Sequence, residues 1–431
     1  MIALVRIVSL FNTKEKRILL SNFLFLSLLQ VANYIFPLIT LPYLVRVLGP
    51  ERFGLISFSQ AFIGYFQILT DYGFNLSATR EISIYREDKE KVSEIFSSVM
   101  IIKSFLFLIS LIIMSIIVFS FEKFKQDWLI YHLTLGMVLG QVLFPVWVFQ
   151  GMEKMKYITF LNILSRLIFT VAIFVFVKKV EDYLYVSLLN SLGSIIAGLL
   201  ALWIVFKDFG IEFRMPSLES IKYHLKEGWY IFISTVAISL YTTSNTFILG
   251  LFTNNTIVGY YSAAERIIKA VLGLLSPISQ TLYPHISKLI KESEETGIKF
   301  IRKVTSLIGG LSFVLSLSVF IFADLIVKII LGSQYAESVV VLRILAFLPF
   351  IVGLSNVFGI QTMLTLSYKK EFSKILIFAS IIDVTLAFIM VPVFKHIGIS
   401  ISVLLSEIFI TVSMFLFLQN KGIKVLGGKF V

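Results

Sequence analysis

The sequence predicts an all-α integral membrane protein of about twelve transmembrane helices. Of its 431 residues, 57% are hydrophobic and 15% are charged, and the mean hydropathy is +0.91. Soluble domains carry about 25% charged residues, so this chain has too few to cover a water-soluble body. Apolar runs long enough to cross a bilayer core of about 30 Å recur along the chain. These runs lack the alternation of barrel strands, which favours helices.

The apolar runs place the spans in order. In the first half we expect spans at 18–45, 53–78, 94–120, 128–150, 157–177 and 184–206. In the second half we expect them at 226–252, 256–284, 304–331, 338–366, 372–394 and 397–418. The first run is too long for the core of a signal peptide. The longest loop, about 207–225, separates a predicted N-terminal lobe, 1–214 (helices 1–6), from a C-terminal lobe, 215–431 (helices 7–12).

The net charge of +12 is explained by membrane topology. Loops on the N-terminal side of the predicted spans hold 25 Lys and Arg residues, and loops on the other side hold 8. Basic residues collect in cytoplasmic loops, so we expect both termini in the cytoplasm. The sequence has no Cys, and its four His residues show no metal-ligand spacing. We therefore expect no cofactor, no metal and no nucleic-acid partner.

The two halves show signs of an internal repeat. The segment 48–54 opens the second predicted helix and 252–259 opens the eighth, and aligning Gly54 with Gly259 gives an offset of 205 residues. Because each half has an even number of spans, the repeat is predicted to be parallel, with the substrate path between two lobes.

Polar stripes run along one face of both helices. The stripe of the second helix is Gln60, Gly64, Gln67, Asp71 and Asn75, and that of the eighth is Ser262, Glu265, Arg266, Lys269, Gly273, Ser276 and Gln280.

Three cations fall deep within predicted spans: Arg166, Arg266 and Lys269. A central Arg or Lys costs about 2.5–3.5 kcal/mol even on the lenient insertion scale. We therefore predict a cationic cavity that binds an anionic headgroup, since Arg suits bidentate contact with phosphate. The polar residues Asn162, Asn245 and Gln60 join this candidate substrate site. The alternative is neutralisation within the fold, for example of Arg266 by Glu265 or Asp71.

Other buried polar residues suggest supporting roles. Asp383 and Glu407 are candidates for binding a coupling ion, H+ or Na+, although salt bridges or coupling to the membrane potential are alternatives. Asp71 is a candidate structural partner near a cytoplasmic gate, and Lys103 could snorkel to the interface. Pro37 lies within the first helix, where a kink can act as a hinge.

Four motifs carry a family resemblance. They are Arg46-Val-Leu-Gly-Pro-Glu-Arg-Phe-Gly54; Asp71-Tyr-Gly-Phe74 with Ala78-Thr-Arg-Glu81; Phe149-Gln-Gly-Met-Glu153; and Gly259-Tyr-Tyr-Ser-Ala-Ala-Glu-Arg266. In this order they resemble the Wzx-type (O-antigen, polysaccharide-biosynthesis) flippases of lipid-linked oligosaccharides. These belong to the multidrug/oligosaccharidyl-lipid/polysaccharide exporter superfamily. Arg46 and Arg80, which lie in these motifs, become gating or structural candidates alongside Asp71 and Pro37.

The resemblance implies two six-helix lobes forming a V around a central cavity. It also implies alternating-access movement of undecaprenyl-diphosphate-linked oligosaccharide from the cytoplasmic to the periplasmic leaflet of the bacterial inner membrane. A polysaccharide polymerase and a chain-length regulator are expected partners. One alternative is a cation-coupled multidrug exporter of the same superfamily. The other is a membrane polysaccharide polymerase or ligase, which the short outer loops disfavour, so we expect a transporter and not an enzyme.

Overall fold

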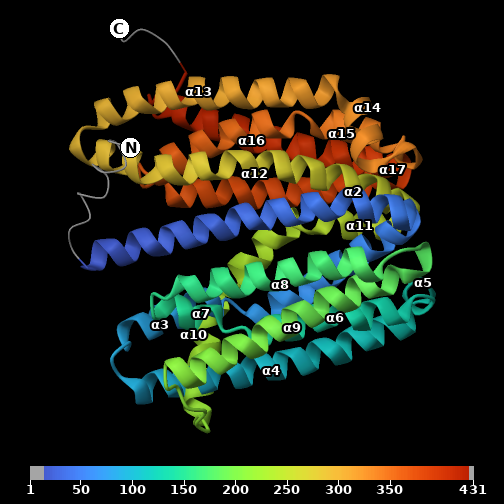
Figure 1. Ribbon diagram of the computed structural model, residues 1–431. Helices are drawn as coiled ribbons and strands as arrows, with labels where there is room; N and C mark the ends of the chain where they lie inside the picture. Colours follow the sequence, from blue (N-terminus) through green and yellow to red (C-terminus); the bar gives the residue numbers. More distant parts are fainter. Residues whose placement is uncertain (1–13, 427–431) are drawn as a thin grey trace. The chain divides into compact units, whose positions relative to one another are not determined.

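A computed structural model describes residues 14–426, and every regular element among them is a helix (Figure 1). Contacts divide the chain into two compact units. Unit 1 holds the residues up to Thr40 together with Phe62–Val236, and unit 2 holds Leu41–Ala61 together with Ala237–Val431. The predicted lobes at 1–214 and 215–431 remain a prediction.

Unit 1 is a helical bundle with one main apolar core. Its elements are α3 (Phe74–Ile84), α4 (Lys89–Ser120), α5 (Glu122–Lys125), α6 (Trp128–Leu143), α7 (Val146–Gly151), α8 (Met155–Phe176), η1 (Val180–Asp182), α9 (Tyr183–Asp208) and α10 (Leu218–Thr242), the last of which runs past the end of the unit. The core joins α3, α4, α7 and α9 around the fully buried Phe74 and Trp147.

Unit 2 is a second bundle, in which α12, α13 and α17 share a core with η4. Its elements are α11 (Ser244–Phe252), α12 (Asn255–Glu292), α13 (Glu294–Ile321), α14 (Ala323–Ile326), η2 (Val327–Leu331), η3 (Ser333–Tyr335), α15 (Ser338–Leu345), α16 (Leu348–Asn356), η4 (Val357–Leu364) and α17 (Lys369–Asn420). Ile301, Phe358 and Met414 lie in its centre.

Two very long helices each contain one non-helical residue. In α2 (Lys14–Asp71) this residue is Gly49, with φ 69°, and in α17 it is Lys395, with φ 51°. Glycine adopts such a left-handed conformation without steric cost. Gly49 falls between the predicted spans 18–45 and 53–78, and Lys395 between 372–394 and 397–418. The count of twelve spans remains a prediction.

Several predicted spans are interrupted, among them 226–252, which breaks at Thr243 between α10 and α11. The span at 53–78 breaks at Tyr72 and Gly73, where both φ angles are positive, and α3 begins directly afterwards. The span at 128–150 breaks at Pro145, which precedes α7. Proline lacks an amide N–H and clashes with the preceding turn, so it ends α6 rather than bending it.

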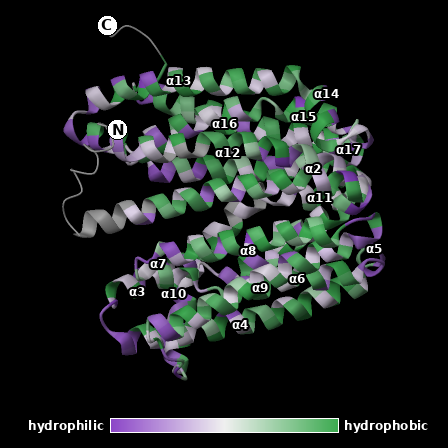
Figure 2. Ribbon diagram, viewed as in Figure 1, coloured by the Kyte–Doolittle hydropathy of each residue, from purple (hydrophilic) through white to green (hydrophobic). Residues whose placement is uncertain are grey.

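The described part of the chain has eight helical segments long and apolar enough to cross a membrane, the longest being Leu24–Ile84 and Lys369–Asn420. Hydrophobic residues run along the helices, and hydrophilic residues gather in loops such as those before α4 and around α5 (Figure 2). This pattern is that of a multi-pass membrane protein. α12 is not among the eight segments, and it carries the polar stripe around Arg266. Two side chains of that stripe, Ser276 and Gln280, lie outside the described ones.

Candidate functional site

Unit 2 brings the first and last motifs together. Residues 50–54 of α2 cross residues 255–259 of α12 with their backbones in contact. Glycine at this crossing removes the side chains that would hold the helices apart. The crossing brings Phe53 and Gln60 of α2 into contact with Arg266 of α12.

Arg266 is held by uncharged groups. Its Nη2 donates a hydrogen bond to Oε1 of Gln60 at 3.0 Å, and its guanidinium lies 4.8 Å from the centroid of the Phe53 ring. Such a cation–π contact contributes about 0.5–2 kcal/mol. Within residues 14–426, no ion pair joins Arg266 to a carboxylate. Its positive charge is therefore balanced by no direct contact in unit 2.

Lys269 differs from Arg266 in both exposure and pairing. Its Nζ lies 3.0 Å from Oε1 of Glu265, and its side chain is 56% exposed. Glu265 also accepts a hydrogen bond from the Tyr261 hydroxyl at 3.5 Å. Glu265 thus makes its direct ion pair with Lys269, while its charge also acts on the neighbouring Arg266, so neutralisation of Arg266 within the fold stays an open alternative.

Arg46 stabilises the turn at Gly49 through a hydrogen bond. Its Nη2 donates to the carbonyl oxygen of Ile329 in η2, and Nε2 of Gln334 donates to the carbonyl oxygen of Val45 at 2.9 Å. These contacts support a structural role for Arg46. Pro37, earlier in the same helix, keeps helical dihedral angles and lies three residues before the end of the N-terminal segment of unit 1.

Arg166 is the deep cation of unit 1. It lies midway along α8, is partly buried, and makes no hydrogen bond or ion pair with any residue that the structure describes. Asn162, one turn earlier, donates its side-chain N–H to the carbonyl oxygen of Ile158 at 2.8 Å. Asn162 is thus bonded within its own helix, and Arg166 retains its donors.

Lys103 is fully inside unit 1, at 1% exposure. The expectation that it snorkels is wrong, because its side chain faces the interior of the bundle. The negative charge of Asp71 interacts electrostatically with the ammonium of Lys103. Oδ1 of Asp71 also accepts a hydrogen bond from Nδ2 of Asn75 at 2.6 Å. Asp71 is thus hydrogen-bonded within unit 1 and its charge acts on the buried Lys103, and its predicted structural role fits these contacts.

The second and third motifs meet where α3 packs on α7. The Thr79 hydroxyl donates to Oε1 of Gln150 at 3.2 Å, and Arg86 pairs with Glu153 at 2.9 Å. Arg80 lies beside this junction with an exposed side chain. The four motifs thus meet in two pairs, one pair in each unit.

Asp383 forms a buried polar cluster in unit 2. It is 1% exposed, and its Oδ1 accepts a hydrogen bond from the Ser406 hydroxyl at 3.1 Å. The Asn245 side chain also hydrogen-bonds this carboxylate, so the structure places Asn245 with Asp383 and not with Arg266. Oδ2 of Asp383 has no hydrogen-bond partner in the part of the chain described. Glu407 follows Ser406 and is partly buried.

Sequence reasoning missed the aromatic support of Arg266. Phe53 packs edge-on against Tyr335 with ring centroids 6.5 Å apart, and both rings are at most 1% exposed. Because Phe53 lies inside the first motif, the sequence did contain a signal that this residue is part of the site. Tyr335 lies 282 residues further on in a short 3-10 turn, and no sequence pattern linked the two.

Comparisons with known proteins agree with this architecture. The family described as "Polysaccharide biosynthesis protein" matches residues 19–290. A relative from Escherichia coli (strain K12), which carries the name O-antigen transporter, is 40% identical over 407 residues, covering 94% of this chain and 97% of the relative.

Two solved structures share the fold. A multidrug resistance MATE family transporter of the MOP superfamily, in an inward-facing conformation, has a TM-score of 0.70 at 16% identity, covering 92% of this chain and 98% of the other. The lipid II flippase MurJ has a TM-score of 0.67 at 13% identity, covering 93% and 87%. With its motifs paired in the structure and its sequence matched over most of its length, the chain belongs to the polysaccharide biosynthesis protein family.

Proposed function

We propose that the chain is a flippase that moves undecaprenyl-diphosphate-linked oligosaccharide from the cytoplasmic to the periplasmic leaflet by alternating access. The O-antigen transporter at 40% identity supports this substrate class. The observation that carries the proposal is Arg266, a cation held by Gln60 and Phe53 with no ion pair to a carboxylate among the described residues.

A guanidinium with free donors suits a diphosphate. Arginine binds phosphate oxygens through two parallel hydrogen bonds, and such charge-assisted bonds are about twice as strong as neutral ones. Gln60 occupies one donor of Arg266 and leaves the others for a ligand. Arg166 gives unit 1 a second cation with the same property. Each arginine is a separate contact point for the anionic headgroup, while the polyprenyl tail stays in lipid.

Membrane orientation follows from the distribution of charge. With 25 basic residues on the N-terminal side against 8 on the other, both termini face the cytoplasm and the chain lies in the inner membrane. The product is then delivered at the periplasmic face. A polysaccharide polymerase and its chain-length regulator, which consume such a product, are the proposed partners.

The test replaces the two arginines. Arg266→Ala and Arg166→Ala, singly and together, should lower surface polysaccharide at least tenfold in a strain that depends on this chain, with equal membrane expression. Lys288→Ala is the control, because Lys288 is a 76% exposed cation at the far end of α12. Normal polysaccharide from a well-expressed double variant would refute the substrate role. Drug resistance without any effect on polysaccharide would instead establish the multidrug-exporter alternative.

Energy coupling is proposed to run through Asp383. The carboxylate is held by Ser406 and Asn245 while Oδ2 remains unpartnered, so a proton or a sodium ion has an oxygen ligand to bind. Intramembrane acids in transporters commonly serve as such ion sites. Glu407 is the second candidate.

A further inference from the structure

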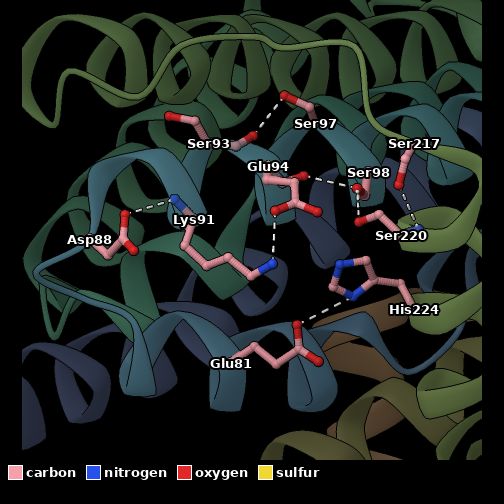
Figure 3. A network of polar contacts seen from close by, with 10 residues as sticks. All are labelled: Glu81, Asp88, Lys91, Ser93, Glu94, Ser97, Ser98, Ser217, Ser220 and His224. Atoms are coloured by element: carbon pink, nitrogen blue, oxygen red, sulfur yellow. Dashed lines mark hydrogen bonds and ion pairs between the residues drawn. The ribbon is translucent and has the colours of Figure 1, made fainter.

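The segment that connects α9 to α10 is hydrogen-bonded to side chains of α4. The Ser93 and Ser97 hydroxyls, one helical turn apart, accept hydrogen bonds from the backbone N–H groups of Glu212 and Arg214 at 3.1 and 2.8 Å. Figure 3 shows these serines on α4, with Ser98 facing Ser220 at 2.9 Å where α10 begins. The connection therefore has a defined position on unit 1 and is not a loose tether.

This docking places Phe213 of the connection in the lining of an apolar groove on unit 1. The groove has a volume of about 380 Å³ and runs between α4 and α9. Phe96, Met100, Phe105 and Leu108 of α4 line it, together with Phe206 of α9 and Phe213 of the connection. Ser104 is the small residue in the lining. A groove of this size accommodates a hydrocarbon segment.

The groove faces hydrocarbon. Both α4 and α9 belong to segments that are candidates to span the membrane. Phe105 and Leu108 are 62% and 54% exposed, and large apolar side chains at such exposure are stable only against lipid or a partner. Trp203 of α9 is 56% exposed, and Nζ of Lys207 lies 4.5 Å from its ring centroid. An exposed Trp beside a Lys is typical of the membrane–water interface.

Charges of both signs lie at the end of the groove near Phe213. Arg214, the next residue, has Nη1 3.3 Å from Oε1 of Glu90 and Nη2 3.7 Å from Oε2 of Glu212. The two carboxylates are 80% and 74% exposed, so they are accessible to a cation in the headgroup layer. A headgroup that places a phosphate on Arg214 and an ammonium on Glu90 or Glu212 satisfies all of these groups. A purely anionic headgroup would meet the carboxylates unfavourably.

We propose that this groove is a binding site for phosphatidylethanolamine of the cytoplasmic leaflet. One acyl chain lies between α4 and α9, and the zwitterionic headgroup contacts Arg214, Glu90 and Glu212. The ethanolamine ammonium has three N–H donors for the carboxylates, whereas a choline headgroup has none. The lipid thereby binds both α4 and the connection to α10. The site is separate from the arginines proposed to bind the substrate.

The test is native mass spectrometry of the purified full chain with phosphatidylethanolamine, phosphatidylcholine and phosphatidylglycerol of identical acyl chains. We expect one phosphatidylethanolamine to be retained at least fivefold more than either of the others. Ser104→Phe, which fills the groove, should abolish the preference. Ile112→Phe on the same helix is the control, since Ile112 is 59% exposed and outside the lining.

A second variant distinguishes loss of lipid binding from misfolding that the larger side chain of Ser104→Phe could cause. Arg214→Gln changes an exposed side chain and should lower phosphatidylethanolamine retention toward the level of phosphatidylcholine. Equal retention of all three lipids by the unaltered chain would overturn the proposal. A preference for phosphatidylglycerol, or unchanged binding in both Ser104→Phe and Arg214→Gln, would overturn it as well.

Discussion

Gly54 and Gly259 approach each other reciprocally. A Cβ on Gly54 would lie 1.8 Å from the carbonyl oxygen of Asn255 and 2.6 Å from the amide nitrogen of Gly259. A Cβ on Gly259 would lie 2.0 Å from the carbonyl oxygen of Pro50. Asn255 stands 205 residues after Pro50, the offset that also aligns the two glycines. Self-complementary contacts of this kind are expected at a twofold axis, so they support the predicted parallel repeat.

Alanine at either glycine should separate α2 from α12. Gly54→Ala and Gly259→Ala each drive a methyl group into backbone, which cannot yield like a flexible side chain, so we expect a loss of about 2 kcal/mol or more. Thermal unfolding followed by fluorescence size-exclusion chromatography measures this. Gly64→Ala is the matched control in α2, because nothing lies within 4 Å of its added methyl group. An unchanged melting temperature in Gly54→Ala would contradict the crossing.

Phe53→Leu should weaken transport without removing the cation. The substitution keeps an apolar side chain but removes the aromatic face under Arg266, a loss of about 0.5–2 kcal/mol of positioning energy. We expect surface polysaccharide to fall severalfold at limiting expression, and less than in Arg266→Ala. Phe378→Leu, at a 60% exposed position, is the control. A Phe53→Leu variant as inactive as Arg266→Ala would point to a packing defect instead.

Lys103 and Asp71 should behave as a coupled pair. Removing one member of a buried charge pair strands the other and costs about 3–5 kcal/mol. Lys103→Met and Asp71→Asn should each destabilise unit 1, whereas the double variant should recover much of the loss. A double-mutant cycle on melting temperatures measures the coupling. Strictly additive effects would show that the two charges do not interact.

Asp383→Asn should remove the coupling of transport to an ion gradient without preventing expression of the protein. The amide keeps the shape and a bond to Ser406 but carries no charge for a cation. We expect normal expression together with loss of any dependence of transport on a proton or sodium gradient in proteoliposomes. Glu407→Gln tests the second candidate in the same assay. Gradient-driven transport that persists in both variants would place the coupling site at neither residue, and transport that never depends on the gradient would leave the membrane potential as the energy source.

His224 should make unit 1 less stable in acid. It is 4% exposed, its Nδ1 lies 3.4 Å from Oε2 of Glu81, and burial lowers its pKa to about 4. Lys91 opposes its protonation and Glu94 favours it (Figure 3). Because the unfolded chain binds a proton near pH 6.5 and the folded chain does not, stability is full above that pH and falls toward pH 4. The fall is expected to reach about 1–3 kcal/mol.

Melting temperatures between pH 7 and 4.5 measure this loss. His224→Gln should flatten the profile over that range. His132→Gln is the control, because His132 sits at the exposed end of α6. An equally steep fall in His224→Gln would assign the acid sensitivity to other groups.

The sequence supported the fold better than the contacts of the site. Hydropathy places apolar runs, and the breaks at Gly49 and Lys395 fall where it predicts turns. The same signal reports depth in the bilayer but not the direction a side chain faces. Lys103 was therefore expected to snorkel although it faces the bundle interior, and Asn245 was grouped with the cations although it bonds Asp383.

Long-range partners were also invisible in the sequence. Motifs identified Gly54 and Gly259 as equivalent, because a glycine within a recurring pattern is recognisable. Tyr335 against Phe53 and Ser93 beneath the connection to α10 have no such signature. Common residue types meet there only because the helices bring them together.

The membership of Leu41–Ala61 in unit 2 has a consequence for biogenesis. This segment leaves the ribosome early, yet Gly259, Arg266 and Ile329, which it contacts, are made at least 200 residues later. At about 5–20 residues per second, the nascent chain carries Arg46 and Gly54 without these contacts for about 10–40 s or more. Packing of the inserted helices is therefore not completed helix by helix. The final packing of the earliest helices must await the second half of translation, which makes this interval a natural point for insertase or chaperone assistance.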